Sequence, residues 1–175
     1  AETTLTIEKG EINLKTGGGS ENSSKTSGGK DNPQWGKWGQ EDSSTTEEDT
    51  ASAKGLKAGG DIKISNATIT TDTSDDSIHS NSNVTIESGT FNLKSGDDGI
   101  HADTSTVINN GNIVIEKSYE GIEGSNVTIN GGTIELTASD DGINSAGGSD
   151  SSSMGGRMGQ NSFTENSDIY IKITG

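Results

Sequence analysis

The sequence predicts an all-β fold: a single-stranded parallel β-helix, in which one chain winds into coils of about 22 residues with three short strands in each coil. Three observations predict it. A five-residue motif returns at a nearly constant interval, short alternations of β-branched residues follow each copy, and only 25% of the 175 residues are hydrophobic. So few apolar residues cannot fill a spherical core, but they can fill a narrow one that runs along stacked coils.

The repeated motif is clearest at residues 97–101, which read Asp-Asp-Gly-Ile-His. Equivalent segments begin 22 residues before it and 22 and 43 residues after it, and a weaker copy begins 44 residues before it. The fourth residue of each clear copy is isoleucine, so we expect these isoleucines to stack inside the coils. The expected stack consists of Ile78, Ile100, Ile122 and Ile143.

Two further alternating segments follow the motif in each coil, and we interpret them as the second and third strands. Gly, Asn, Asp and Ser lie between them as turn residues. The second segments are 62–64, 84–86, 106–108 and 127–129, and the third are at Ile69 and at 91–93, 113–115 and 134–136. At the two ends of the chain, 5–7 and 169–173 match the second segment, and 12–14 match the third.

The regular spacing indicates one β-helix domain over residues 1–175, which is either complete or a segment of a longer chain. Two long loop insertions interrupt the repeat, at 17–52 and 146–166. Both leave the coils at turns, where insertions are tolerated.

The charge of the chain excludes several partners. It has 27 acidic and 12 basic residues and a net charge of −15, so nucleic acid and anionic membranes are poor partners, and cations or cation-bridged ligands are better ones. There is no apolar run long enough for membrane insertion. The absence of cysteine excludes disulfides and cysteine-based metal sites. The chain begins at Ala1 without a targeting segment, which fits a processed secreted protein or an excised segment.

Stacking the coils in register places equivalent residues about 4.8 Å apart and creates three polar columns. Two carboxylates at that distance repel by roughly 3 kcal/mol at an effective dielectric constant near 20, so they must be neutralised by protonation or by cations. The first column is Asp76, Asp98, Glu120 and Asp141, and the second is Asp75, Asp97, Tyr119 and Asp140. The third, which points away from the isoleucine stack, is Lys57, His79, His101, Glu123 and Asn144.

Calcium suits such columns because it takes 6–8 oxygen ligands in flexible geometry. We predict Ca²⁺ between adjacent coils, with turn formation by Asp-Asp-Gly as the alternative explanation. The predicted metal ligands are Asp75, Asp76, Asp97, Asp98, Glu120, Glu123, Asp140, Asp141 and Asn144.

The predicted ligand-binding residues are Lys57, His79, His101, Trp35 and Trp38. The two histidines are either a transition-metal or proton-transfer pair, or a stacked ladder beside its Asp neighbours. The two tryptophans either stack on sugar rings or fold down over the isoleucine column.

These motifs resemble the calcium-binding, pectate-lyase-like β-helix carbohydrate-binding domains of secreted proteins from clostridia and related Gram-positive bacteria. The segments 54–58, 75–80, 97–102, 118–124 and 140–144 carry the resemblance, which spans about 5–148 and 168–175. It implies a right-handed β-helix with bound calcium, located outside the cell or at its surface. It also implies binding of cellulose or of acidic sugars such as polygalacturonate.

We therefore predict a secreted, calcium-dependent carbohydrate-binding module that is not an enzyme. Calcium would bridge protein carboxylates to those of an acidic polysaccharide. The alternative is a structural subunit that stacks head to tail into an extracellular filament, since its end coils expose unpaired strand edges. A polysaccharide lyase is less favoured, because its base would have to be Lys54 or Lys57, at one end of the columns.

Overall fold

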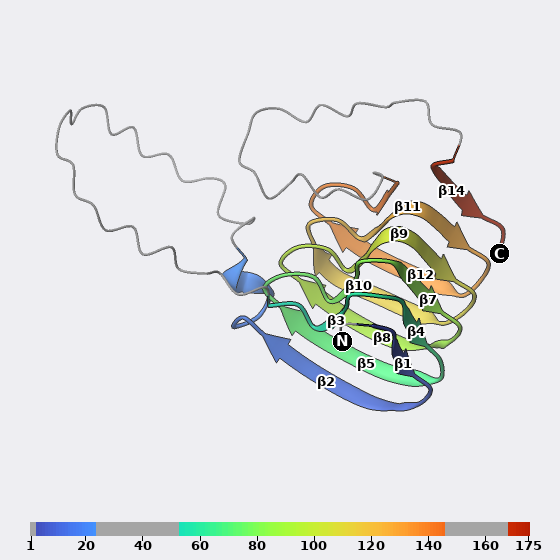
Figure 1. Cartoon of the computed structure of the whole chain (residues 1–175). Coiled ribbons are helices and arrows are strands. Elements are labelled where there is room, and N and C mark those ends of the chain that lie inside the picture. The colour runs from blue at the N-terminus through green and yellow to red at the C-terminus, as the bar shows by residue number, and fades with distance from the viewer. Residues whose placement is uncertain (1–2, 24–52, 146–167) are drawn as a thin grey trace, which may run out of the picture.

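The computed structural model describes residues 3–23, 53–145 and 168–175, and within them the chain is a stack of parallel coils (Figure 1). Apart from one 3-10 turn, η1 (Ser20–Asn22), all regular elements of these residues are strands, which confirms the predicted β-solenoid. The strands are β1 (Leu5–Ile7), β2 (Gly10–Thr16), β3 (Leu56–Ala58), β4 (Ile62–Ile64), β5 (Ala67–Thr73), β6 (Ile78–Ser80), β7 (Asn83–Ile86), β8 (Gly89–Ser95), β9 (Ile100–Ile108), β10 (Asn112–Ser118), β11 (Ile122–Ile129), β12 (Thr133–Ala138), β13 (Ile143–Asn144) and β14 (Tyr170–Ile173).

The coils contribute to two parallel sheets that face each other. One sheet runs β1-β4-β7-β9-β11-β13, with β3, β6 and β14 as further members, and the other runs β2-β5-β8-β10-β12. β13 and β14 both pair with β11, so the segment that separates them in sequence interrupts a single coil. The predicted insertions 17–52 and 146–166 lie in sequence between β2 and β3 and between β13 and β14; most of the first and all of the second fall outside the described residues, so they are still predictions.

The prediction of three short strands in every coil is correct only for the early coils. The first and second segments merge into one strand in β9 and again in β11. β11 pairs with β9 through a register shift between Gly124 and Asn126. The interval between paired residues drops there from 22, for Ile100 and Ile122, to 21, for Thr106 and Val127, so one residue fewer must span the corner.

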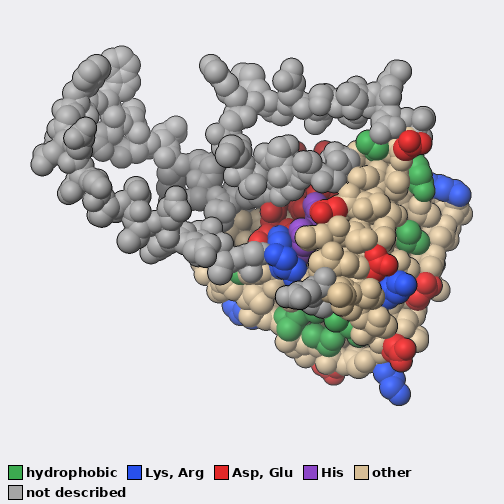
Figure 2. All heavy atoms as spheres, in the orientation of Figure 1, with side chains coloured by type: hydrophobic (Ala, Val, Ile, Leu, Met, Phe, Trp, Pro, Cys, Tyr) green, Lys and Arg blue, Asp and Glu red, His purple; other side chains and the backbone are tan. Residues whose placement is uncertain are grey.

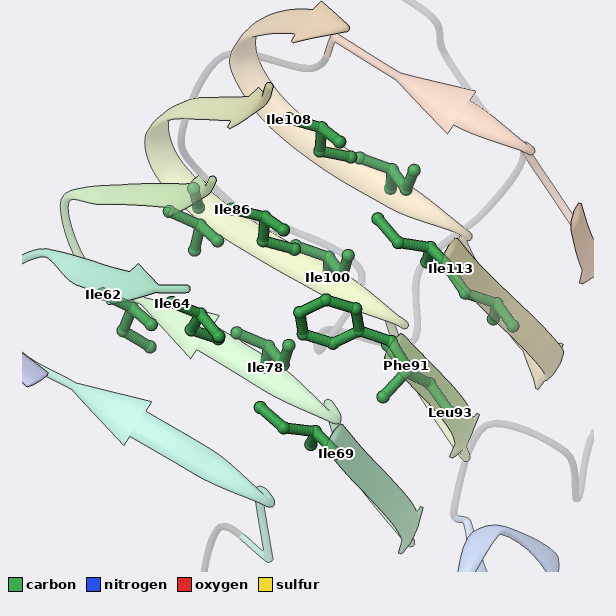
Figure 3. Close-up of a cluster of buried hydrophobic side chains, with 14 of the residues drawn as sticks. Ile62, Ile64, Ile69, Ile78, Ile86, Phe91, Leu93, Ile100, Ile108 and Ile113 are labelled. Carbon is green, nitrogen blue, oxygen red and sulfur yellow. The ribbon is translucent and has the colours of Figure 1, made fainter. Parts of the chain in front are cut away.

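The core is the predicted narrow column between the sheets (Figure 3). Ile78, Ile100 and Ile122 pair in register and are fully buried. From the opposite sheet, Phe91 and Leu93 point into the same space and are also fully buried. Burial of a side chain of this size contributes about 1.5–3 kcal/mol. A line of such residues therefore stabilises coils that have no spherical core.

Close packing explains the glycine of the Asp-Asp-Gly motif. A Cβ added at Gly99 would lie 2.6 Å from the carbonyl oxygen of Gly121 and 2.7 Å from Cδ1 of Ile115. Serine replaces this glycine in an earlier coil, where the buried Ser77 hydroxyl accepts a 2.7 Å hydrogen bond from Thr71. The motif is therefore shaped by the neighbouring coil as well as by turn formation.

The last described coil is less covered than the others. In β14, Ile171 and Ile173 are 46% and 58% exposed. A cavity of about 270 Å³ opens beside them. It is lined by Ile129, Gly132, Ile134, Leu136, Ile143, Ile173 and Gly175. No helix in the described residues is long and apolar enough to cross a membrane.

Candidate functional site

Backbone hydrogen bonds hold the repeated motifs directly above one another. Gly99 N donates to Glu120 O at 3.0 Å, and Gly121 N donates to Asp141 O at 2.9 Å, with the same pattern in the earlier coils. The strand that follows the motif pairs in the predicted register, Lys57–His79–His101–Glu123–Asn144. We call the resulting group the polar ladder: Lys54, Lys57, Asp75, Asp76, His79, Asp97, Asp98, His101, Glu120, Glu123, Asp140, Asp141 and Asn144.

The middle of the polar ladder is buried and its far end is open. Asp76, Asp98 and His101 are 2–3% exposed and Glu123 is 7% exposed, whereas Asp140 and Asp141 are exposed. Figure 2 shows acidic, histidine and basic side chains gathered on one part of the described surface. The structure thus brings the predicted metal residues to one region, but it places them in different electrostatic environments.

At the N-terminal end of the polar ladder, the lysine of one coil neutralises two aspartates of the next. Lys54 Nζ lies 2.9 Å from Asp75 Oδ1 and 2.5 Å from Asp76 Oδ2. Asp76 also accepts hydrogen bonds from His79 Nδ1 at 2.7 Å and from the backbone N–H of Asp98 at 3.0 Å. Burial alone would raise the pKa of Asp76, but the contacts with His79 and Lys54 outweigh it and lower that pKa.

The second rung centres on His101. Its Nδ1 lies 2.6 Å from Glu123 Oε2 and 3.2 Å from Asp98 Oδ2, and its Nε2 lies 3.0 Å from Asp103 Oδ1. Burial disfavours the charged ring, but hydrogen bonds to Asp98 and Glu123 outweigh it and raise the pKa of His101 to about 11. His101 is therefore a cation at neutral pH, and it lowers the pKa of Glu123 against the effect of burial.

Asp98 is neutralised by keeping its own proton and not by a neighbouring cation. Burial raises its pKa to about 9, with the charges of Asp76, Asp97 and Glu123 adding to the rise and the hydrogen bond to His101 opposing it. Glu120 behaves similarly: burial and then the charges of neighbouring carboxylates raise its pKa to about 7, although Asn144 Nδ2 donates to Glu120 Oε2 at 2.9 Å. Protonation of Asp98, with Lys54 and His101 as cations, removes most of the repulsion expected in the buried rungs.

The two histidines form a stacked pair. Their ring centroids are 4.7 Å apart with an interplanar angle of 6°, an arrangement that fits both a stacked ladder and a metal-binding pair. Lys57, the residue before them in the column, is exposed. Trp35 and Trp38 lie outside the described residues, so their predicted contact with sugar is still a prediction.

Three residues of the site were missed as site residues: Lys54, Asn81 and Asp103. Lys54 occupies the motif position taken by Asp76 in the next coil, and this charge reversal within a column is the signal that predicts an ion pair. Asn81 and Asp103 each lie two residues after a ladder histidine and within 3.0 Å of its Nε2. Their common position in the repeat could have identified them as one further column.

Three groups in the described residues bring metal-ligating atoms within 4.8 Å of one another. Only one of them, Asp75, Asp76 and Asp97, consists entirely of oxygen donors, as calcium requires. The Lys54 ammonium contacts two of its three carboxylates. This group fits calcium if Lys54 gives up part of its contact. The other groups contain His101, and the predicted ligands Glu120, Asp140, Asp141 and Asn144 belong to none of the three.

Lys54 is poorly suited to act as the base of a lyase. Burial alone would lower its pKa, but Asp76 and Asp75 outweigh burial and raise it. A base must lose its proton near the working pH, and this ion pair opposes that loss.

Comparison with known proteins identifies a family for this chain. A family model described as carbohydrate-binding domain-containing protein matches residues 1–99 and 83–162. No curated protein and no solved structure matches the chain. The two matched ranges together include every residue of the polar ladder and most of the coils. The chain therefore belongs to the carbohydrate-binding domain-containing protein family.

Proposed function

We propose that the chain is a secreted module that binds an acidic or cell-wall polysaccharide, such as polygalacturonate or cellulose, in a calcium-dependent manner. The observation that carries this proposal is the all-oxygen group of Asp75, Asp76 and Asp97 in a chain of the carbohydrate-binding family. The family match also agrees with a binding protein that does no chemistry on its ligand.

The negative charge of the chain explains why binding of an acidic polysaccharide would need calcium. A chain with a net charge of −15 repels a polyuronate unless cations lie between them. Asp75, Asp76 and Asp97 would hold the ion, which when bound supplies a positive charge that protein and uronate carboxylates can share. Lys57, exposed on the first coil of the ladder, would add a contact for an acidic sugar.

The test compares binding of polygalacturonate and of cellulose in calcium and in chelator. The main variant is Asp97→Asn, because Asp97 belongs to the oxygen group without being bound by Lys54. Glu116→Gln is the matched control, since Glu116 is an exposed carboxylate on the other sheet, paired with Lys94. We expect polygalacturonate binding only with calcium, at least tenfold weaker in Asp97→Asn and unchanged in Glu116→Gln. Equal binding in chelator would reject the calcium bridge and leave carbohydrate binding by another surface.

Head-to-tail assembly is a second candidate function, supported by the apolar cavity and the exposed Ile171 and Ile173 of the last described coil. A partner coil would bury these side chains. Sedimentation velocity at millimolar calcium tests the idea: assembly predicts species that grow with protein concentration and are lost in Ile171→Asp. A monomer at every concentration would reject it.

A further inference from the structure

We propose that His79, His101 and Asp103, with Asn81, form a binding site for a divalent transition metal of the zinc class. Its metal ligands differ from those of the proposed calcium group, although Asp76 belongs to that group and also holds the inner nitrogen of His79. The site lies at the outer edge of the stacked histidine pair, where two ring nitrogens and the Asp103 carboxylate lie within 4.8 Å of one another and Asn81 Oδ1 lies 3.0 Å from Nε2 of His79. It stands whether or not the polysaccharide proposal holds.

Both rings point the same nitrogen outward. In each histidine Nδ1 is bound to inner carboxylates: Asp76 at 2.7 Å for His79, and Glu123 at 2.6 Å for His101. The opposite nitrogen, Nε2, lies 3.0 Å from Asn81 Oδ1 in His79 and 3.0 Å from Asp103 Oδ1 in His101. Because the rings are nearly parallel, the two Nε2 atoms lie side by side with an oxygen donor beside each.

The inner carboxylates are placed where a histidine metal site needs them. A metal-binding imidazole usually donates its second N–H to a carboxylate or carbonyl, which fixes the tautomer and the ring orientation. Asp76 and Glu123 are positioned to do this for His79 and His101. Both carboxylates are at least nine-tenths buried, so the rings are held by rigid surroundings. The ladder therefore orients both Nε2 atoms for a ligand at its outer edge.

The donor set selects the class of metal. Imidazole nitrogens with one carboxylate suit zinc, copper or nickel, whereas calcium prefers oxygen alone. The donors of His79, His101 and Asp103 already lie within 4.8 Å of one another. Metal–ligand bonds of about 2.0–2.1 Å bring neighbouring donors to roughly 3.3 Å, so the rings need only tilt together at their outer edges. Binding also displaces the Nε2 proton of His101 to solvent.

A metal ion can reach this edge from solvent. The side chains of His79 and Asp103 are 15% and 38% exposed, whereas those of His101 and Asp98 are each 4% exposed. The histidines are visible at the surface in Figure 2, among acidic and basic side chains. The remaining group, Asp98, His101 and Glu123, uses the inner nitrogen and is buried on all sides, so it acts as support for the ring.

The small number of histidines in the chain makes the spectroscopic signals of the proposed site easy to assign. The chain has two histidines and no cysteine, so every imidazole signal comes from this pair. Untagged protein in excess calcium, which fills oxygen-only sites, is titrated with Zn²⁺ by calorimetry. Loading with one equivalent of Cu²⁺ then gives an electron paramagnetic resonance spectrum. We expect one Zn²⁺ per chain and nitrogen hyperfine splitting from two imidazoles.

The variants His79→Gln and Asp103→Asn remove one ligand each at partly exposed positions, so folding is expected to survive and is checked by circular dichroism. We expect each to weaken Zn²⁺ binding at least tenfold, and His79→Gln to reduce the copper signal to one nitrogen. Glu116→Gln, remote from the histidines, should change neither. Unchanged Zn²⁺ affinity in both ligand variants, or a copper spectrum without two nitrogens in the unmodified chain, would overturn the site.

Discussion

The apolar column is built on the same strands as one column of the polar ladder, Lys57–His79–His101–Glu123–Asn144, one residue away, and the two follow opposite rules. Ile78, Ile100 and Ile122 repeat the same side chain, whereas the neighbouring column changes at almost every rung. Identical apolar side chains stack favourably because each adds contacts of the same kind. Identical buried charges repel, so a polar column is stable only if its members differ or are neutralised. In this solenoid, a position that keeps the same apolar side chain in successive coils packs in the core. A position whose side chain changes from coil to coil is one where buried charges must be balanced.

The apolar column should be the more sensitive of the two to truncation. Ile100→Ala leaves a cavity between two neighbouring isoleucines in a tightly packed line, and we expect it to lower the free energy of unfolding by about 4 kcal/mol. Urea denaturation measures the change. Ile173→Ala is the matched control, because Ile173 is 58% exposed and should lose less than about 1 kcal/mol. Similar losses in the two variants would show that the column is not the main source of stability.

The stability of the polar ladder should depend on the alternation of cations and carboxylates between its coils. His101→Gln removes the cation between Glu123 and Asp103, and we expect a loss of about 3 kcal/mol, because one partner of a buried pair is left uncompensated. Adding Glu123→Gln to this variant should restore part of the loss. Additive losses in the double-mutant cycle, measured by urea denaturation, would mean that the two side chains do not interact.

The two regions also differ in how far they could be predicted from the sequence. The isoleucine column could be placed residue by residue, because a constant interval and an unchanged side chain suffice to set the register. The polar columns were aligned correctly, and protonation or cations were expected to neutralise them, but the sequence did not show which positions use a protonated carboxylate and which use a lysine or histidine cation. The roles of Lys54 and Asp103 depend on how long side chains reach across coils, which repeat spacing does not specify. The merged strands were missed because spacing does not mark them: β9 is continuous although it keeps the 22-residue interval to the separate strands β6 and β7.

The neutralised rungs predict an unusual pH dependence. In the folded chain the pKa is about 11 for His101 and about 9 for Asp98, both above the unfolded values near 6.5 and 3.8. The folded state therefore holds protons that the unfolded chain has lost, and stability falls as the pH rises. In chelator we expect a loss of about 2–3 kcal/mol between pH 7 and pH 8, roughly 1.4 kcal/mol per pH unit for each of the two retained protons, measured by urea denaturation. His101→Gln should flatten this curve, and a stability that rises with pH would contradict the assignment.

The smallest effect is expected where the ladder opens to solvent. Burial raises the pKa of Glu120 to about 7, and Glu123, Asp141 and Asp140 add to the rise, so its charge is unfavourable above neutral pH. In chelator at pH 8, Glu120→Gln should therefore stabilise the fold by about 1 kcal/mol, a figure reduced for solvent screening at this partly exposed rung. At pH 4 the glutamate is already protonated and the variant should change nothing. Thermal melts at both pH values measure this. If calcium binds at Glu120, adding the ion reverses the sign at pH 8, because a charged carboxylate holds the ion more strongly than a neutral amide. The same substitution therefore separates a rung that relies on protonation from one that relies on metal.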